Sequence, residues 1–185
     1  FRHDMYKEYK ANRPPMPDEL QRQLPHLWEI LDAMNIPVLK KDGVEADDII
    51  GTLAVRAQNE GLDTYIVSGD KDFMQLINEN IFLYAPGTKK SPNPIIYDSK
   101  KVEDKWGVPP EKIIDLLGLM GDSSDNVPGV SGVGEKTAVK LIKKYGSLNG
   151  ALENADQVPN KRARTGLQEG AKNARLSQDL VTIML

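Results

Sequence analysis

The chain of 185 residues contains no cysteine and only two histidines. Without cysteine it can form no disulfide, no thiolate zinc site and no cysteine nucleophile, which fits a reducing, cytoplasmic location. His3 and His26 stand apart in the sequence, so we expect both to be structural. The sequence lacks a run of about 18 apolar residues and a secretion signal, and we therefore expect neither a membrane span nor a membrane partner.

The charge is also unevenly distributed. The formal net charge is −3, yet residues 1–13 carry +2, residues 135–144 carry +3 and residues 161–175 carry +4. The middle of the chain is correspondingly acidic. This distribution is expected if the two ends contact a polyanion and the middle binds cations.

Hydrophobic periodicity divides the chain near residue 106. Before this point, expected helices alternate with expected strands, which predicts an α/β fold with a parallel sheet and helices on both faces. After Pro109 and Pro110 only helices are expected. The domains are therefore placed at 1–105 and 106–185. The expected helices are 1–13, 18–35, 45–60, a short one that follows Asp72 and runs through Leu76, 98–106, 113–120, 135–145, 148–153 and one from about 171. The expected strands are 36–40, 64–68, 81–84 and 95–97.

Within the first half, two helices have apolar stripes. Residues 18–35 carry one stripe of leucines and a methionine. In the helix that follows Glu45, we expect Ile49, Leu53 and Ala57 to face the core.

Seven carboxylates stand at the ends of these elements, where the topology could bring them together. Singly, each has an ordinary structural explanation as a helix cap, a first-turn acid or a turn residue. Two like charges 4 Å apart cost about 4 kcal/mol at an effective dielectric of 20, so a convergent set needs cations. Ligands that are all oxygen select Mg²⁺ or Mn²⁺, and two such ions can clamp a phosphodiester. The candidate ligands are Glu45, Asp47, Asp48, Asp70, Asp72, Asp122 and Asp125.

Two further segments have features suited to nucleic acid. On a helix through residue 13, Arg2, Tyr6, Tyr9 and Arg13 would share one face, which suits a single strand; the alternative is an amphipathic helix with buried aromatics. Near residue 130, Gly129, Gly132 and Gly134 precede a lysine-rich helix, an arrangement that lets the backbone approach a phosphate. This segment is not a nucleotide-binding P-loop, because Glu135 separates Gly134 from Lys136.

The motifs resemble the 5′ nuclease (flap endonuclease) superfamily, in particular the 5′-3′ exonuclease domain of bacterial DNA polymerase I. The likeness runs over essentially the whole chain. The residues that carry it, in order, are Tyr9-Lys10-Ala-Asn-Arg13-Pro-Pro-Met-Pro, Gly43-Val-Glu45-Ala-Asp47-Asp48, Gly69-Asp70-Lys71-Asp72 and Met120-Gly-Asp122-Ser-Ser-Asp125-Asn through Gly134-Glu-Lys-Thr-Ala.

The resemblance implies a PIN-like (resolvase-like) nuclease domain followed by a helix-hairpin-helix (SAM-fold-like) region. The seven acids would bind two Mg²⁺ ions. A helical arch that threads the 5′ single strand would include Arg2, Tyr9, Lys10 and Arg13, and Lys10 and Arg13 would act in catalysis by steadying the scissile phosphate. The duplex backbone would contact the hairpin residues, together with a K⁺ ion and the two lysines that follow; these residues are Gly129, Val130, Gly132, Val133, Gly134, Lys136 and Lys140.

The implied substrates are DNA with a 5′ flap, nicked or gapped duplex, and the junction of an RNA primer with DNA. A monomer is expected, with polymerase domains possible after Leu185. The family also has an N-terminal strand and two further acids that precede the position of Phe1, so we expect a fragment that could be inactive alone. Two alternatives stay open, a DNA-binding module without catalysis and an RNA-cutting PIN-type enzyme.

Overall fold

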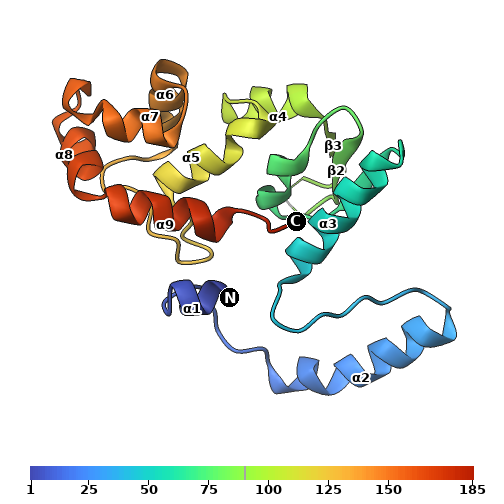
Figure 1. Cartoon of the computed structure of the whole chain (residues 1–185). Helices are drawn as coiled ribbons and strands as arrows, with labels where there is room; N and C mark the ends of the chain where they lie inside the picture. The colour runs from blue at the N-terminus through green and yellow to red at the C-terminus, as the bar shows by residue number, and fades with distance from the viewer. Residues whose placement is uncertain (90) are drawn as a thin grey trace.

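The computed structural model describes residues 1–89 and 91–185 (Figure 1). Helices and strands alternate as far as Trp106, and only helices follow in the described residues. The first part consists of α1 (Arg2–Met5), α2 (Asp18–Ala33), α3 (Ala46–Asn59), β1 (Thr64–Val67), the 3₁₀ helix η1 (Lys71–Leu76), β2 (Ile81–Ala85), β3 (Ile95–Tyr97) and α4 (Ser99–Trp106).

The sheet is small and mixed. β1 pairs with β2 in parallel, Thr64 opposite Ile81, and β2 pairs with β3 antiparallel, Leu83 opposite Tyr97. The fully parallel sheet expected from the sequence is therefore wrong. The reason is the connection through residues 86–94, which is shorter than the dozen or more residues that a parallel crossover needs.

The strand expected at 36–40 is also wrong, because these residues have no regular structure. Pro37 lies inside this segment and cannot donate a hydrogen bond to a neighbouring strand. Ile36, Val38 and Leu39 are all exposed. Apolar, β-branched composition alone therefore does not form a strand here.

The N-terminal segment differs most from expectation. The helix ends at Met5, turns follow, and Lys10 adopts a left-handed conformation (φ 56°) that no helix can continue through. The predicted exposed face is wrong for two of its residues, since Arg2 and Tyr9 are both buried. Their side chains point at carboxylates, as described below, and not at solvent.

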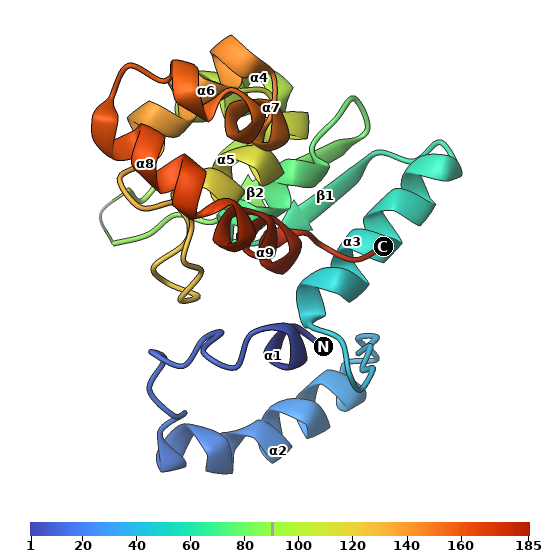
Figure 2. The same cartoon turned by 60° about the vertical axis from the view of Figure 1, so that its left-hand side comes forward.

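Helix α2 lies apart from the rest of the molecule in Figures 1 and 2. None of its residues is buried, and its apolar stripe remains accessible, with Leu20 46%, Leu27 44% and Met34 64% exposed. The helix forms as expected, but its apolar stripe stays largely exposed, and its contacts include those with residues 35–40, which follow it.

Helix α3 packs against β1 and β2 with a face other than the expected one. Asp48, Gly51 and Ala54 are buried, whereas Leu53 is 43% exposed. The rotation follows from two close contacts. Arg2 draws Asp48 inward, and a Cβ on Gly51 would lie 2.6 Å from Cγ2 of Ile183, so only glycine lets the C-terminal segment approach this closely.

The second part is a helical cluster around α5. Its elements are the 3₁₀ helix η2 (Pro110–Lys112), α5 (Ile113–Met120), α6 (Glu135–Tyr145), α7 (Leu148–Glu153), the 3₁₀ helix η3 (Ala155–Gln157), α8 (Lys161–Glu169) and α9 (Ala171–Val181). Helix α5 lies alongside α9 (Figure 1), and Leu116, Leu117 and Leu119 are almost completely buried there. No described helix is long and apolar enough to cross a membrane.

Candidate metal centre and nucleic-acid interface

Three carboxylates from two parts of the chain converge. Oxygens of Asp72, Asp122 and Asp125 lie within 4.8 Å of one another. Asp72 stands at the start of η1, where Oδ1 of Asp70 accepts its backbone N–H at 3.0 Å. Asp122 follows α5 and pairs with Val127 in an antiparallel bridge, which folds the turn that carries Asp125 back toward η1.

The ionised form of Asp72 is disfavoured. Burial, followed by the nearby Asp70, Asp122 and Asp125, raises the pKa of Asp72 to about 7, although Lys71 opposes the shift. Its Oδ1 is buried and accepts no hydrogen bond from any described residue. An unpaired buried acceptor beside two more carboxylates favours a cation at this point.

Lys71 supplies the nearest positive charge. Its Nζ lies 2.5 Å from Oδ2 of Asp122 and 3.7 Å from Oδ1 of Asp72. Burial alone would raise the pKa of Asp122, but hydrogen bonds from Lys71 and from the N–H of Ser124 outweigh it and hold this pKa below its usual range. The two neighbouring acids therefore have pKa values shifted in opposite directions.

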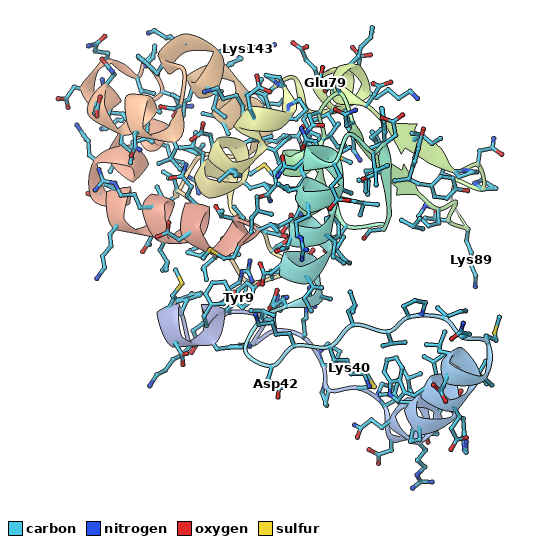
Figure 3. All side chains as sticks on the ribbon, turned by 45° about the vertical axis from the view of Figure 1, so that its right-hand side comes forward. Tyr9, Lys40, Asp42, Glu79, Lys89 and Lys143 are labelled. Carbon is cyan, nitrogen blue, oxygen red and sulfur yellow. The ribbon has the colours of Figure 1, made fainter. Side chains whose placement is uncertain are left out.

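A second group of contacts joins Asp125 to Glu45, the N-cap of α3. Nζ of Lys10 lies 2.9 Å from both carboxylate oxygens of Glu45 and 3.6 Å from Oδ2 of Asp125. The Tyr9 hydroxyl lies 3.3 Å from Oε2 of Glu45 and 3.3 Å from Oδ2 of Asp125. Figure 3 shows Tyr9, in the N-terminal segment, next to the start of α3. Arg13, at the exposed rim, donates to Oδ1 of Asp125.

Arg2 binds both carboxylate oxygens of Asp48 and also lies 3.6 Å from Oε2 of Glu45. Its two terminal nitrogens lie 2.9 and 2.8 Å from the two oxygens of Asp48, and the guanidinium also donates to the carbonyls of Leu180 and Thr182. Asp48 further accepts the N–H groups of Met184 and Glu45. Burial would raise the pKa of Asp48, but these hydrogen bonds lower it overall. We call this group the Arg2–Asp48 clasp.

The remaining acids flank the cluster. Burial first, and then Asp70 and Glu45, raise the pKa of Asp47, so these three carboxylates are electrostatic neighbours. Asp70 lines an open cleft of about 330 Å³ together with Asp122 and Asp125. The structure thus joins Asp70, Asp72, Asp122 and Asp125 directly and places Glu45 and Asp47 beside them. Both oxygens of Asp48 are bound by Arg2, which bridges Asp48 to Glu45.

This donor set fits a hard divalent cation. All the candidate ligands are carboxylate oxygens, and no described histidine belongs to the cluster. Oδ1 of Asp72 is buried without a hydrogen-bond partner among the described residues, and the pKa of Asp72 is raised. A bound cation would stabilise the ionised form of this acid, so Oδ1 is the expected ligand atom. The sequence alone did not identify Lys71 as a partner of the cluster. Its position between Asp70 and Asp72 was the available signal.

The hairpin between α5 and α6 lies next to this cluster. Gly129 and Gly132 have positive φ, 62° and 78°, and Gly134 caps α6. The N–H of Gly129 donates to the buried hydroxyl of Ser177 at 2.9 Å, and a Cβ on Gly132 would lie 2.5 Å from the side chain of Arg162. Helices α8 and α9 therefore support the hairpin from behind.

The candidate hairpin residues differ in what they can offer a ligand. The side chains of Val130 and Val133 are buried in the core, so only their backbone atoms could contact a ligand. The lysines at 136 and 140 are exposed along α6. Sequence reasoning missed Ser177 and Arg162, whose separation from the hairpin along the chain gives no local signal.

The chain belongs to the 5′-3′ exonuclease family. Residues 1–107 match the model for the 5′-3′ exonuclease N-terminal resolvase-like domain, and residues 108–185 match the model for the 5′-3′ exonuclease C-terminal SAM fold. These matches agree with the mixed α/β first part and the helical second part. Whether the chain divides at residue 105 remains a prediction.

Particular relatives are similar over the full length of the chain. DNA polymerase I of Bacillus subtilis is 45% identical over 185 residues, which cover 100% of this chain and 21% of that protein. The 5′-3′ exonuclease of Buchnera aphidicola is 43% identical over 189 residues, covering 99% of this chain and 61% of that protein. The chain therefore spans about a fifth of the polymerase relatives.

Solved structures share the fold. The bacteriophage T5 5′-exonuclease with bound zinc has a TM-score of 0.79 at 22% identity, covering 98% of this chain and 69% of that one. The catalytic core of Rad2 in complex with DNA substrate has a TM-score of 0.56 at 18% identity, covering 92% and 53%. At these identities the likeness shows the fold alone.

Proposed function

We propose that the chain provides the nuclease activity of a metal-dependent 5′ nuclease that hydrolyses phosphodiester bonds in DNA at 5′ ends and 5′ flaps. The proposal rests on the convergence of Asp72, in η1, with Asp122 and Asp125 within 4.8 Å. The turn that carries Asp122 and Asp125 leads directly into the glycine hairpin. The family assignment supports the proposal, as does the name of the Buchnera relative, a 5′-3′ exonuclease.

Two Mg²⁺ or Mn²⁺ ions are the proposed cofactors. Asp70, Asp72, Asp122 and Asp125 are positioned to hold one ion, with Glu45 and Asp47 available for a second. When bound, such ions activate water and stabilise the leaving oxygen. The clasp gives Asp48 a different part in this scheme, since its hydrogen bond to the Glu45 N–H fixes the start of α3 and thereby the position of Glu45.

The cations at the rim are the proposed phosphate ligands. Lys10 and Arg13 now bind carboxylates that a metal would neutralise, so both side chains would be free to bind the scissile phosphate. The Tyr9 hydroxyl, held between Glu45 and Asp125, would then position these two acids. Arg2 acts in this proposal through Asp48 and not through contact with DNA.

The hairpin is the proposed duplex contact. Gly132 and Gly134 would bring backbone N–H groups to a phosphate, with a K⁺ ion held by hairpin carbonyls, whereas the Gly129 N–H is already bound by Ser177 and would shape the hairpin. Lys136 and Lys140 would add phosphate contacts along α6. Support comes from the open space around the exposed Gly134 and from the contacts of Ser177 and Arg162 with Gly129 and Gly132, which hold the hairpin in place.

The proposed partners are 5′-flap, nicked or gapped DNA and the RNA primer–DNA junction. A structure of T5 flap endonuclease, whose fold the chain shares, contains DNA and metal ions, and the proposal extends this kind of substrate to the chain. Fusion to polymerase domains, as in the polymerase I relatives, is proposed together with a monomeric state and a cytoplasmic location.

The test is cleavage of a labelled 5′-flap duplex by the full protein that carries this chain, in Mg²⁺. Asp125→Asn should reduce the rate by about 100-fold, because changing even the residues that orient metal ligands costs about 10–100-fold. The matched control is Asp104→Asn, which removes an exposed carboxylate whose one ion pair among the described residues is with Lys100. Equal rates for both variants would contradict the proposal. Salt-dependent binding without cleavage would favour a binding module, and preferential cleavage of RNA would favour a PIN-type ribonuclease.

A further inference from the structure

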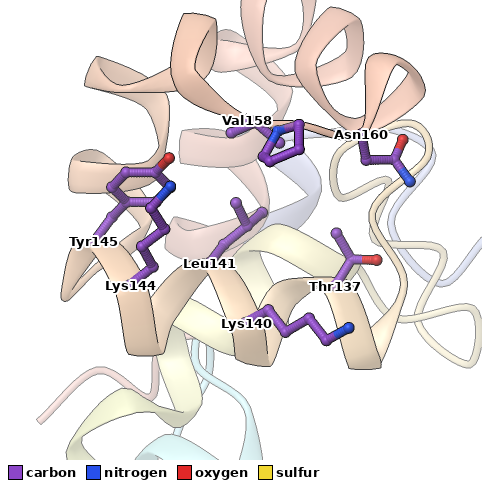
Figure 4. Close-up of a pocket in the computed structure, with 8 residues that line it drawn as sticks. Thr137, Lys140, Leu141, Lys144, Tyr145, Val158 and Asn160 are labelled. Carbon is purple, nitrogen blue, oxygen red and sulfur yellow. The ribbon is translucent and has the colours of Figure 1, made fainter.

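A second pocket lies on α6, away from the carboxylate cluster (Figure 4). It has a volume of about 360 Å³ and lies between one face of α6 and the segment that leads into α8. Its lining residues are Thr137, Lys140, Leu141, Lys144, Tyr145, Val158, Pro159 and Asn160. The volume is large enough for part of a small organic ligand and within the usual range for ligand sites.

The walls of this α6 pocket combine an apolar floor with two cations. Leu141 and Val158 are core residues that continue into the hydrophobic interior. Neither Lys140 nor Lys144 has a carboxylate within 4.0 Å among the described residues, in contrast to Lys10 and Lys71. Nζ of Lys144 lies 4.8 Å from the centre of the Tyr145 ring, which keeps its charge beside the pocket.

The hydroxyl of Tyr145 has no hydrogen-bond partner in the described part of the chain, although it is buried. A buried polar atom that lacks a partner costs about 1–3 kcal/mol, so native structures rarely keep one without a reason. An acceptor atom on a ligand in the α6 pocket would satisfy this hydroxyl. The pocket therefore offers two cations, a donor and an apolar surface.

We propose that the α6 pocket binds a nucleotide unit. Its phosphate lies against Lys140 and Lys144, its sugar or base packs on Leu141 and Val158, and the Tyr145 hydroxyl donates to it. The proposal extends the proposed function when the nucleotide belongs to a DNA strand, and it stands separately when the nucleotide is free.

The geometry of α6 connects the pocket to the hairpin. Lys136, Lys140 and Lys144 are spaced four residues apart, so they rise about 6 Å per step along the helix. A strand whose phosphate is held by the hairpin at Gly134 can therefore reach the α6 pocket by following these lysines. Asn160 at the far side caps α8 through Ala163, which fixes that wall.

The experiment measures affinity for a 5′-flap duplex by fluorescence anisotropy across a salt series, with the full chain and with Ca²⁺ in place of Mg²⁺. The variants are Lys144→Gln and Tyr145→Phe. The matched control is Lys143→Gln, which removes the same charge from the neighbouring position outside the pocket; Figure 3 labels this side chain. A second arm follows binding of deoxyadenosine monophosphate, with inorganic phosphate as comparison, through the NMR signals of the Leu141 and Val158 methyl groups.

Lys144→Gln should weaken duplex binding about five- to tenfold and reduce the slope of log K against log salt by about 0.9, the value for one phosphate contact. Tyr145→Phe should weaken binding about three- to tenfold and leave the slope unchanged. Its melting temperature should stay the same or rise, because an unpaired hydroxyl is removed. Lys143→Gln should stay within about twofold of the wild type.

The two arms separate the sources of the nucleotide. Loss of duplex affinity in the two pocket variants alone assigns the pocket to a DNA strand. If both variants bind the duplex as tightly as the wild type but no longer show the methyl shifts that the mononucleotide causes, the pocket binds a free nucleotide. If the wild type fails to bind the duplex at all, the proposed function fails and the mononucleotide arm still decides the pocket. Wild-type behaviour of both pocket variants in both arms overturns the inference.

Discussion

Replacing Arg2 by methionine should destabilise the protein strongly. The side chain of Arg2 is 4% exposed and pairs with Asp48, whose side chain is also 4% exposed. Methionine keeps much of the apolar volume but leaves the carboxylate of Asp48 buried without its cation. The clasp also ties the start of the chain to α3 and to the end of α9 through the carbonyls of Leu180 and Thr182.

The expected loss is about 3–5 kcal/mol, the usual cost of removing one partner of a buried ion pair. For a chain of this size 1 kcal/mol corresponds to about 2–4 °C, so the melting temperature should fall by roughly 6–20 °C. The double variant Arg2→Met with Asp48→Leu should recover part of the loss, since it removes the unpaired charge as well.

The pH dependence gives an independent check. The pKa of Asp48 is lowered in the folded state, so the clasp stabilises the protein above the unfolded pKa of about 3.9 and loses that contribution as pH falls through the lower, folded value. Urea unfolding should therefore be measured for the wild type and for Arg2→Met from about pH 2 to about pH 7, a range that brackets the titration. The free energies of unfolding of the two proteins should differ at neutral pH and converge in acid. A loss below about 1 kcal/mol at neutral pH would refute the clasp.

Three further predictions concern the cluster, the hairpin and α2. The raised pKa of Asp72, about 7, means that its ionised form destabilises the fold as pH rises from about 3.9 through 7. At pH 8 in EDTA, the free energy of unfolding measured in urea should therefore be about 2–4 kcal/mol higher for Asp72→Asn than for the wild type. The two proteins should be equally stable near pH 4, and the difference at pH 8 should be smaller in Mg²⁺. A difference that stays constant across pH would contradict the raised pKa of Asp72. Gly132→Ala should cost about 1–2 kcal/mol of stability, because Gly132 has a φ of 78° and a Cβ there would meet Arg162. Gly134→Ala should change stability by less than about 0.5 kcal/mol, because no atom of the described residues lies within 4 Å of its Cβ position. Thermal melts compare the two variants, and equal losses would be inconsistent with the hairpin geometry. Leu27→Gln on the exposed helix α2 should change the free energy of unfolding by less than about 0.5 kcal/mol, whereas Leu117→Ala in α5 should lower it by about 2–5 kcal/mol. A large loss for Leu27→Gln would mean that α2 packs against another surface.

Local patterns in the sequence predicted much of the candidate site. Asp72 and Asp122 follow a strand and a helix whose apolar runs are unambiguous, and carboxylates at such ends readily meet in space. Gly129 and Gly132 adopt the positive φ values that their residue type favours. The alternation of elements before Trp106 and the helices after it were also evident, because both follow from hydrophobic period.

Long-range pairing could not be predicted in this way. An arginine at position 2 looks like a surface residue, and only the folded chain shows that it pairs with a carboxylate 46 residues away. The rotation of α3 depends on that pair and on the approach of Ile183 to Gly51. The direction of β3 was predicted wrongly for a related reason. Its antiparallel pairing follows from the short connection to β2 and not from the composition of the strand.

The most direct test of the central claim is a crystal structure with Mn²⁺, located by its anomalous scattering. We predict an ion bound by oxygens of Asp72, Asp122 and Asp125 at about 2.1 Å, with Lys71 displaced from Asp122. Mn²⁺ bound only at exposed surface carboxylates, with Lys71 and Arg13 still paired to Asp122 and Asp125, would contradict it.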